Sequence, residues 1–262
     1  MKKIIESIGR RVSHSIEELG YVSVLLLDTL TWLALGKSRK QSVRAVHIVH
    51  EAMHIGVHAI PIVIVLCFSV GMMLAMQGLE TLKPYGAQSQ VVTGIALSVT
   101  REFAALIVGI LVAGRSGSAI TARIGTMKQS QEIDALRVIG IQPVRYLAAP
   151  LLVAMMVMVP CLTILGDLAG LLGGAVYTAY ELNMSIVTYF ERSFAVLAMY
   201  DIFQGLIKSL VFAIIIVLVG VSNGFQVQGG AEGVGRATTR SVVLSISLIV
   251  VADMIFTFFL TR

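Results

Sequence analysis

The chain has 262 residues, of which 56% are hydrophobic and only 13% are charged. Because soluble domains carry about 25% charged residues, this composition excludes an ordinary soluble protein and indicates a protein of the lipid bilayer. The formal net charge of +5 fits basic cytoplasmic loops better than a nucleic-acid-binding surface, so we expect no nucleic acid partner. Cys67 and Cys161 both lie in apolar runs, and we expect no disulfide.

Residues 1–44 form a basic, amphipathic segment that we expect to be cytoplasmic or interfacial. Within it, residues 19–36 are apolar over a length barely sufficient to span a bilayer, and Asp28 interrupts them. Both flanks are basic, and the positive-inside rule places both on the cytoplasmic side. A helix lying in the headgroup region satisfies this requirement and a crossing helix does not, so we predict an interfacial helix.

Five longer apolar segments follow, and each is long enough to cross about 30 Å of hydrocarbon. The third is too long for one perpendicular crossing, so we expect it to tilt, to kink near Pro160 or to protrude. The sequence therefore predicts an all-α integral membrane protein, a single domain over residues 1–262 with a five-helix transmembrane bundle over residues 59–260. The five segments cover residues 59–78, 91–114, 146–176, 202–221 and 241–260.

Lysine and arginine are distributed unevenly among the loops. Loop 115–145 contains five of them and loop 222–240 contains two, whereas loops 79–90 and 177–201 contain one each. The positive-inside rule therefore predicts that the N-terminus and the two basic loops are cytoplasmic, and that the C-terminus lies outside.

Two stripes of small residues recur at a spacing of four. Such stripes let helices approach closely, either within the chain or at a dimer seam, and both readings stay open at this point. The stripes are Gly109, Ala113 and Gly117, and Gly166, Gly170 and Gly174.

Ionisable residues inside the apolar segments are informative, because each costs about 2.5–3.5 kcal/mol at the bilayer centre. Arg101 and Glu102 are neighbours that point about 100° apart on a helix, so each needs a partner elsewhere. Lys208 and Asp253 lie at a similar depth, roughly 10 Å below the outer surface, and we predict that they pair, with Glu102 as a candidate third member. Such a group either clamps the bundle or lines a substrate cavity, and the two roles are compatible.

Loop 115–145 predicts a short amphipathic cytoplasmic helix with an N-cap, an acidic first turn, a basic last turn and a stop signal. Its apolar face would carry Ile133, Leu136 and Ile139. A soluble partner could bind such a helix, or it could rest on lipid. The cap, charge and stop residues are, in order, Ser130, Glu132, Asp134, Arg137, Gly140 and Pro143.

The run from His50 to His54 matches the H-E-x-x-H pattern of zinc proteases, and His47 and His58 extend the stripe. An intramembrane zinc metalloprotease is therefore the alternative function. Such an enzyme needs a distant third ligand, and the only apparent one, Asp167, lies in a poorly matching context. We favour protonatable histidines at the interface and expect no metal site.

Gly36, Lys37 and Ser38 look like the end of a P-loop, but Thr31 stands where its first glycine belongs. We therefore expect this chain to bind no ATP and no cofactor of its own. Energy from ATP would have to come through a partner.

Six runs of the sequence together form a recognisable pattern: residues 101–102, 113–119, 124–127, 133–136, 206–209 and 235–243. With these runs in order, the sequence resembles the MlaE/YrbE-type permeases over nearly its whole length. That resemblance implies a homodimeric permease in the inner membrane of a double-membraned bacterium, or in a related plastid, that moves phospholipids or related lipids between two membranes. It also implies a cytoplasmic ABC ATPase, an MCE-domain substrate-binding protein and, in some systems, a STAS-domain subunit.

The resemblance also assigns roles to particular residues. The cytoplasmic helix would be the coupling helix that docks on the ATPase, with Ser130, Glu132, Asp134, Ala135, Leu136 and Arg137. The predicted substrate pathway comprises a lipid pocket at the dimer interface and the intramembrane charges. Its residues are Met72, Met76, Gln77, Leu79, Arg101, Glu102, Lys208 and Asp253.

Overall fold

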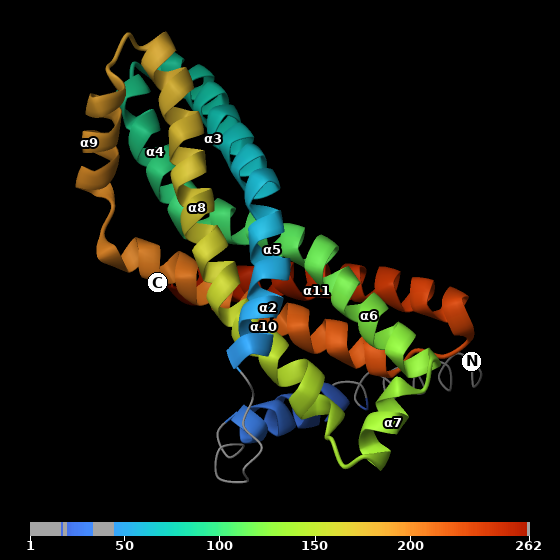
Figure 1. The fold of residues 1–262 in the computed structure, drawn as a ribbon. Coiled ribbons are helices and arrows are strands. Elements are labelled where there is room, and N and C mark those ends of the chain that lie inside the picture. Colours follow the sequence, from blue (N-terminus) through green and yellow to red (C-terminus); the bar gives the residue numbers. More distant parts are fainter. Residues whose placement is uncertain (1–16, 18–19, 34–44, 261–262) are drawn as a thin grey trace, which may run out of the picture.

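The structure is a computed structural model that describes residue 17, residues 20–33 and residues 45–260 (Figure 1). Most of the predicted segment 1–44 lies outside the described residues. Within the described part every regular element is a helix, and five helices are long and apolar enough to cross a membrane. The all-α prediction and the five predicted spans are confirmed. These spans are Ala45–Tyr85, Gln88–Gln129, Val144–Glu181, Met199–Phe225 and Gly230–Leu260.

The first two spans are built from several pieces each. The first contains α2 (Ala45–Gly56), a 3-10 turn and α3 (Ile60–Leu82). The second contains α4 (Val91–Ser98), α5 (Ala104–Val112) and α6 (Ser118–Gln129), which are joined by two π-helical turns. These turns, Val99–Phe103 and Ala113–Gly117, insert extra backbone without ending the helix.

The remaining spans are more regular. The third begins with a π-helical turn and continues as α8 (Ala149–Glu181), whose 33 residues run through Pro160 without interruption. At 1.5 Å per residue α8 is about 50 Å long, which exceeds the hydrocarbon thickness as predicted. A short helix, α9 (Ile186–Val196), leads to α10 (Met199–Phe225), and α11 (Gly230–Leu260) ends the described chain.

The helices gather in two groups. Figure 1 shows α3, α4 and α8 together, with α9 beside α4, and α6, α10 and α11 packed on one another. Helix α5 packs against both α8 and α10 and so joins the groups. Arg101 and Glu102, in the π turn that precedes α5, therefore lie where the two groups meet.

Helices α3 and α8 approach each other closely. A Cβ atom on Gly71 would lie 1.9 Å from the carbonyl oxygen of Gly170, and one on Gly173 would lie 2.0 Å from that of Phe68. Both small-residue stripes are also buried within this one chain, against α3 and α4 or against α10. Their role in the structure is intrachain packing.

This contact gives a stability prediction. Gly173→Ala forces a methyl group into backbone and should cost about 1–3 kcal/mol of unfolding free energy. Gly94→Ala is the matched control, because nothing lies within 4 Å of its added methyl, and alanine favours a helix over glycine. Thermal unfolding in detergent should show a midpoint below that of the wild type for Gly173→Ala but not for Gly94→Ala. Equal midpoints for the two variants would refute the close approach.

The helix Gly20–Leu33 is shorter than the five spans. Its Leu25 and Thr29 are buried. Burial raises the pKa of Tyr21, and the positive charge of Arg137 partly offsets this rise. Arg145 also lies over the ring of Trp32, 5.8 Å from its centroid. These contacts hold the N-terminal helix at the end of the bundle that carries the basic loop.

The short helix predicted in loop 115–145 is present as α7 (Glu132–Val138), but the prediction that Ser130 caps it is wrong. Gln131 precedes the helix with a φ of 62° and makes no side-chain cap. Because α6 extends to Gln129, the hydroxyl of Ser130 is used at the end of that helix, where it donates to the carbonyl oxygen of Thr126 at 3.0 Å.

Candidate functional site

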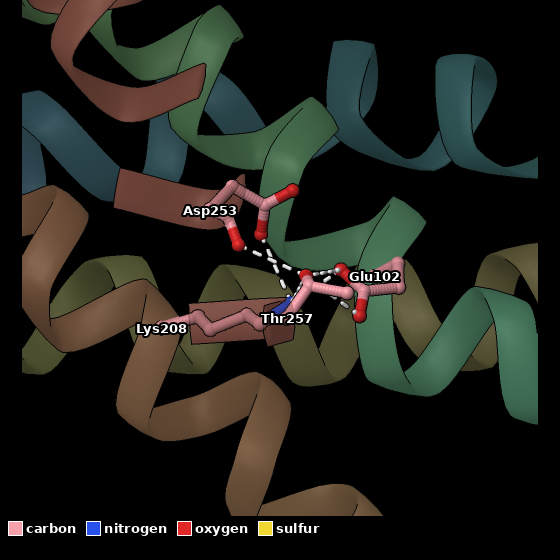
Figure 2. A network of polar contacts seen from close by, with 4 residues as sticks. All are labelled: Glu102, Lys208, Asp253 and Thr257. Carbon is pink, nitrogen blue, oxygen red and sulfur yellow. Dashed lines mark hydrogen bonds and ion pairs between the residues drawn. The ribbon is translucent and has the colours of Figure 1, made fainter. Parts of the chain in front are cut away.

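A buried group of polar side chains joins the second span to α10 and α11 (Figure 2). At its centre is Lys208 of α10, which is fully buried. Its Nζ forms an ion pair with Asp253 Oδ1 at 3.0 Å and a hydrogen-bonded ion pair with Glu102. The predicted pair of Lys208 and Asp253 is confirmed, and Glu102 is the third member.

Thr257 completes this group, which we call the Lys208 cluster: Glu102, Lys208, Asp253 and Thr257. The Thr257 hydroxyl lies 3.1 Å from each Glu102 carboxylate oxygen and 2.9 Å from the carbonyl oxygen of Asp253, and it accepts a hydrogen bond from Lys208 Nζ at 3.0 Å. The sequence alone does not single out Thr257. Its position four residues after Asp253 puts it on the same face of α11, which is the one signal that could have found it.

Arg101 turns away from this cluster to a different partner. Its Nε donates to Asp201 Oδ1 at 2.7 Å, and the second oxygen of Asp201 accepts from the backbone N–H of Ala198 at 2.9 Å. Asp201 thus pairs with Arg101 and caps the start of α10 at once. The prediction that Arg101 and Glu102 need separate partners is confirmed, although the sequence gives no reason to choose Asp201.

The π-helical turn Val99–Phe103 explains this division of partners. A π turn adds a residue to the helical repeat and redirects consecutive side chains, and such turns are frequent at functional sites. Arg101 reaches the first turn of α10, while Glu102 reaches Lys208 two turns further along. One turn of the second span therefore holds two separate ion pairs.

The Asp201 contact can be tested by substitution. Asp201→Asn removes the charge that pairs with Arg101 and weakens the cap of α10, so unfolding free energy should fall by about 1.5–3 kcal/mol. Glu191→Gln, an exposed change on α9, should leave the thermal midpoint unchanged. If both variants unfold at the wild-type midpoint, Asp201 does not stabilise the bundle.

The Lys208 cluster places one cation against two carboxylates. Such an arrangement is costly to bury and more costly to break, because removing the cation leaves unpaired negative charge. The Glu102 side chain keeps 27% of its surface exposed, whereas Lys208 keeps none. Asp253 keeps 14%, so Glu102 is the most exposed of the three charged members. The cluster can serve as a clamp and as part of a polar wall.

The other predicted pathway residues lie on α3 and are not gathered at one place. Gln77 lines a cavity of about 280 Å³ between α3 and α4. Met76 is exposed and Met72 is half-buried, whereas Leu79 is buried in a cluster with Ala75 of the same helix. Their contact with lipid stays a prediction.

The predicted coupling residues are placed at the surface around α7. Ile133 is buried and anchors the helix, while Val138 is 87% exposed. Asp134 pairs with Lys128 at 3.4 Å and with Arg137 at 3.3 Å. The other predicted members are also accessible: Ser130, Glu132 and Ala135 are exposed and Leu136 is half-buried.

The histidine stripe does not assemble the zinc site of the alternative function. Across residues 20–33 and 45–260, no three His, Cys, Asp or Glu side chains come together to hold a metal ion. Glu51, which would be the catalytic base, forms an ion pair with Arg123 at 2.7 Å. Asp167 is instead buried in α8.

Comparison with known proteins agrees with this arrangement. The model of the family Permease MlaE matches residues 48–259. The chain belongs to the MlaE permease family. It is 34% identical to a probable ABC transporter permease of Rickettsia typhi over 93% of both chains. It is 36% identical to one from Synechocystis over 76% of both chains.

A further relative is the intermembrane phospholipid transport system permease protein MlaE of Haemophilus influenzae. The two are 29% identical over 97% of this chain and 95% of that protein. Family membership makes this chain a multi-pass membrane transporter permease of the ABC type. A permease is a transport subunit, so the zinc protease is not the function of this MlaE-family chain.

Proposed function

We propose that this MlaE-family permease moves phospholipids or related lipids between the inner and outer membranes. The observation that carries the proposal is the likeness along 97% of the chain to a permease named for intermembrane phospholipid transport. The Lys208 cluster supports it, because charge in a bilayer is costly and is kept where it serves a pathway or a conformational change.

ATP would be bound and hydrolysed by a partner, and the permease would hold no cofactor of its own. The proposed assembly is a homodimer in the cell inner membrane with a cytoplasmic ABC ATPase, an MCE-domain protein and, in some systems, a STAS-domain subunit. The basic end around α7 would face the cytoplasm with the N-terminus, and the C-terminus would face the periplasm.

The surface of α11 suits a dimer seam. Its outward side is rich in exposed large apolar side chains, among them Val243, Met254 and Phe259. A shallow groove of about 840 Å³ runs along the first half of the helix, from Glu232 to Ser247. In a dimer these surfaces would be covered by the second copy.

In the proposed mechanism, closure of the ATPases on ATP pushes α7. Ile133 fastens α7 to the bundle, so the push would pass to α6 and α8, which flank it in the chain. The pathway between protomers would then narrow and drive lipid toward or from the MCE protein. The Lys208 cluster would keep α10 and α11 moving as one unit with the second span.

The proposal is tested by purifying the tagged permease from native membranes and identifying bound proteins and lipids by mass spectrometry. An ABC ATPase, an MCE-domain protein and enriched phospholipid are expected. Recovery of the permease with no ATPase, or with no lipid above the level found on an unrelated membrane protein, would refute it.

A further inference from the structure

A second cavity, of about 340 Å³, lies between the first span and the start of α6. Residues of the Lys208 cluster do not line it. Its walls bring imidazoles from α2 and the 3-10 turn against guanidinium groups from the π turn Ala113–Gly117 and from α6. The charged and titratable lining residues are His50, Glu51, His54, His58, Arg115 and Arg123.

Two contacts brace this cavity. Arg115 Nη1 donates to the carbonyl oxygen of His58, and Arg123 Nη1 pairs with Glu51 Oε1 at 2.7 Å. His54 lies in the sequence between Glu51 and His58, which make these two contacts. It shares a helical face with His50 and His58, because residues four apart lie on one side of a helix. The rings of His54 and His58 are 5.9 Å apart. The histidines of the lining therefore face one shared space.

The charge of the lining is positive. Glu51 is the one carboxylate among the lining residues, and Arg123 already neutralises it. Arg115 bonds to a neutral carbonyl and has no carboxylate partner among the described residues. Helix α8, which packs on α2, contributes no residue to the lining. Three imidazoles, from His50, His54 and His58, add hydrogen-bonding nitrogens to the same lining.

An anion is the ligand that this lining recognises. Guanidinium groups bind phosphate oxygens through a rigid fork of donors, and protonated imidazoles add charge-assisted hydrogen bonds. The volume falls at the lower end of the range for small-molecule sites, about 300–1,000 Å³. It therefore has room for a phosphate group and the first atoms of an ester substituent.

We propose that this cavity is a phosphate-binding site in which Arg115, His54 and His58 are the donors. The phosphate could belong to a lipid headgroup or be free in solution, since both present the same oxygens.

The test is calorimetric binding to the purified full-length permease in an uncharged detergent. The probes are inorganic phosphate, dioctanoyl phosphatidic acid and dioctanoylglycerol, which lacks the phosphate. Phosphatidic acid should bind to the permease, because it carries the phosphate group that the cavity recognises. Dioctanoylglycerol should not bind at this site.

Arg115→Gln and His54→Gln should each weaken phosphatidic acid binding about tenfold, the effect of losing one charge-assisted hydrogen bond. Arg192→Gln on α9 is the matched control and should bind as wild type does. Thermal unfolding of each variant checks that it is folded, and His54→Gln changes an exposed residue with no side-chain bond that the fold requires.

Binding of both phosphate probes identifies the anion itself as the ligand, and binding of phosphatidic acid alone identifies a lipid headgroup. Either result supports the site. Equal binding of phosphatidic acid and dioctanoylglycerol, or unchanged affinity in both Gln variants, overturns it. The readout is binding by the permease alone, so its failure is distinct from a failure of the proposed transport.

Discussion

Lys208→Ala should reduce the unfolding free energy of the permease by about 3 kcal/mol, because it leaves the partly buried carboxylates of Glu102 and Asp253 without their cation. Lys208 is fully buried and pairs with both of them. Thermal unfolding in detergent and the yield of monodisperse protein measure the loss. A wild-type midpoint for this variant would show that the cluster does not hold the bundle together.

A triple variant separates the structural role of the Lys208 cluster from a role in transport. Lys208→Met with Glu102→Gln and Asp253→Asn removes all three charges while keeping similar volumes, and buried ion pairs can often be replaced in this way at little cost in stability. We expect its unfolding midpoint to return close to wild type and its lipid transport to stay low. Lipid transport at the wild-type rate in a stable triple variant would show that the cluster has a structural role only.

The second large effect is expected on α7. Val138→Asp places a charge on the most exposed apolar side chain of that helix and should weaken ATPase binding by at least about 2 kcal/mol, as at an interface hot spot, or roughly 30-fold. Glu132→Lys should act in the same direction by reversing a surface charge. Co-purification and ATPase activity of the assembled complex measure both effects.

The matched control is Val187→Asp on α9, another exposed valine. Helix α9 follows α8 whereas α7 precedes it, so this change lies at the opposite end of the third span. It should leave ATPase binding unchanged. Normal assembly in both α7 variants, with the permease folded, would rule out α7 as the coupling helix.

Much of the fold follows from the sequence, because hydrocarbon thickness and the cost of buried charge leave few choices. The length of the apolar runs predicts the five spans, and the depths of Lys208 and Asp253 predict their ion pair. Helical geometry predicts that Arg101 and Glu102 need separate partners, but it does not identify them. These features depend on the distances between residues along the sequence, which can be read directly.

Other features depend on where neighbouring helices end and meet, which spacing does not show. Asp201 lies at a helix start, so its sequence position looks like an outer loop although the residue is buried. Ser130 has the pattern of an N-cap, yet the second span continues to Gln129, well past its predicted end at residue 114, and the Ser130 hydroxyl donates to the carbonyl oxygen of Thr126 in α6. The π turn at Arg101 and the cavity at His54 likewise arise only from packing between segments.

The most direct test of the account is lipid transfer in proteoliposomes that contain the permease with the ATPase and MCE-domain protein that co-purify with it. The measurement follows a fluorescent phospholipid leaving the donor membrane, with and without ATP. The account predicts ATP-dependent transfer that disappears when the ATPase is left out. Equal transfer by the permease alone, or none with every partner and ATP present, would contradict it.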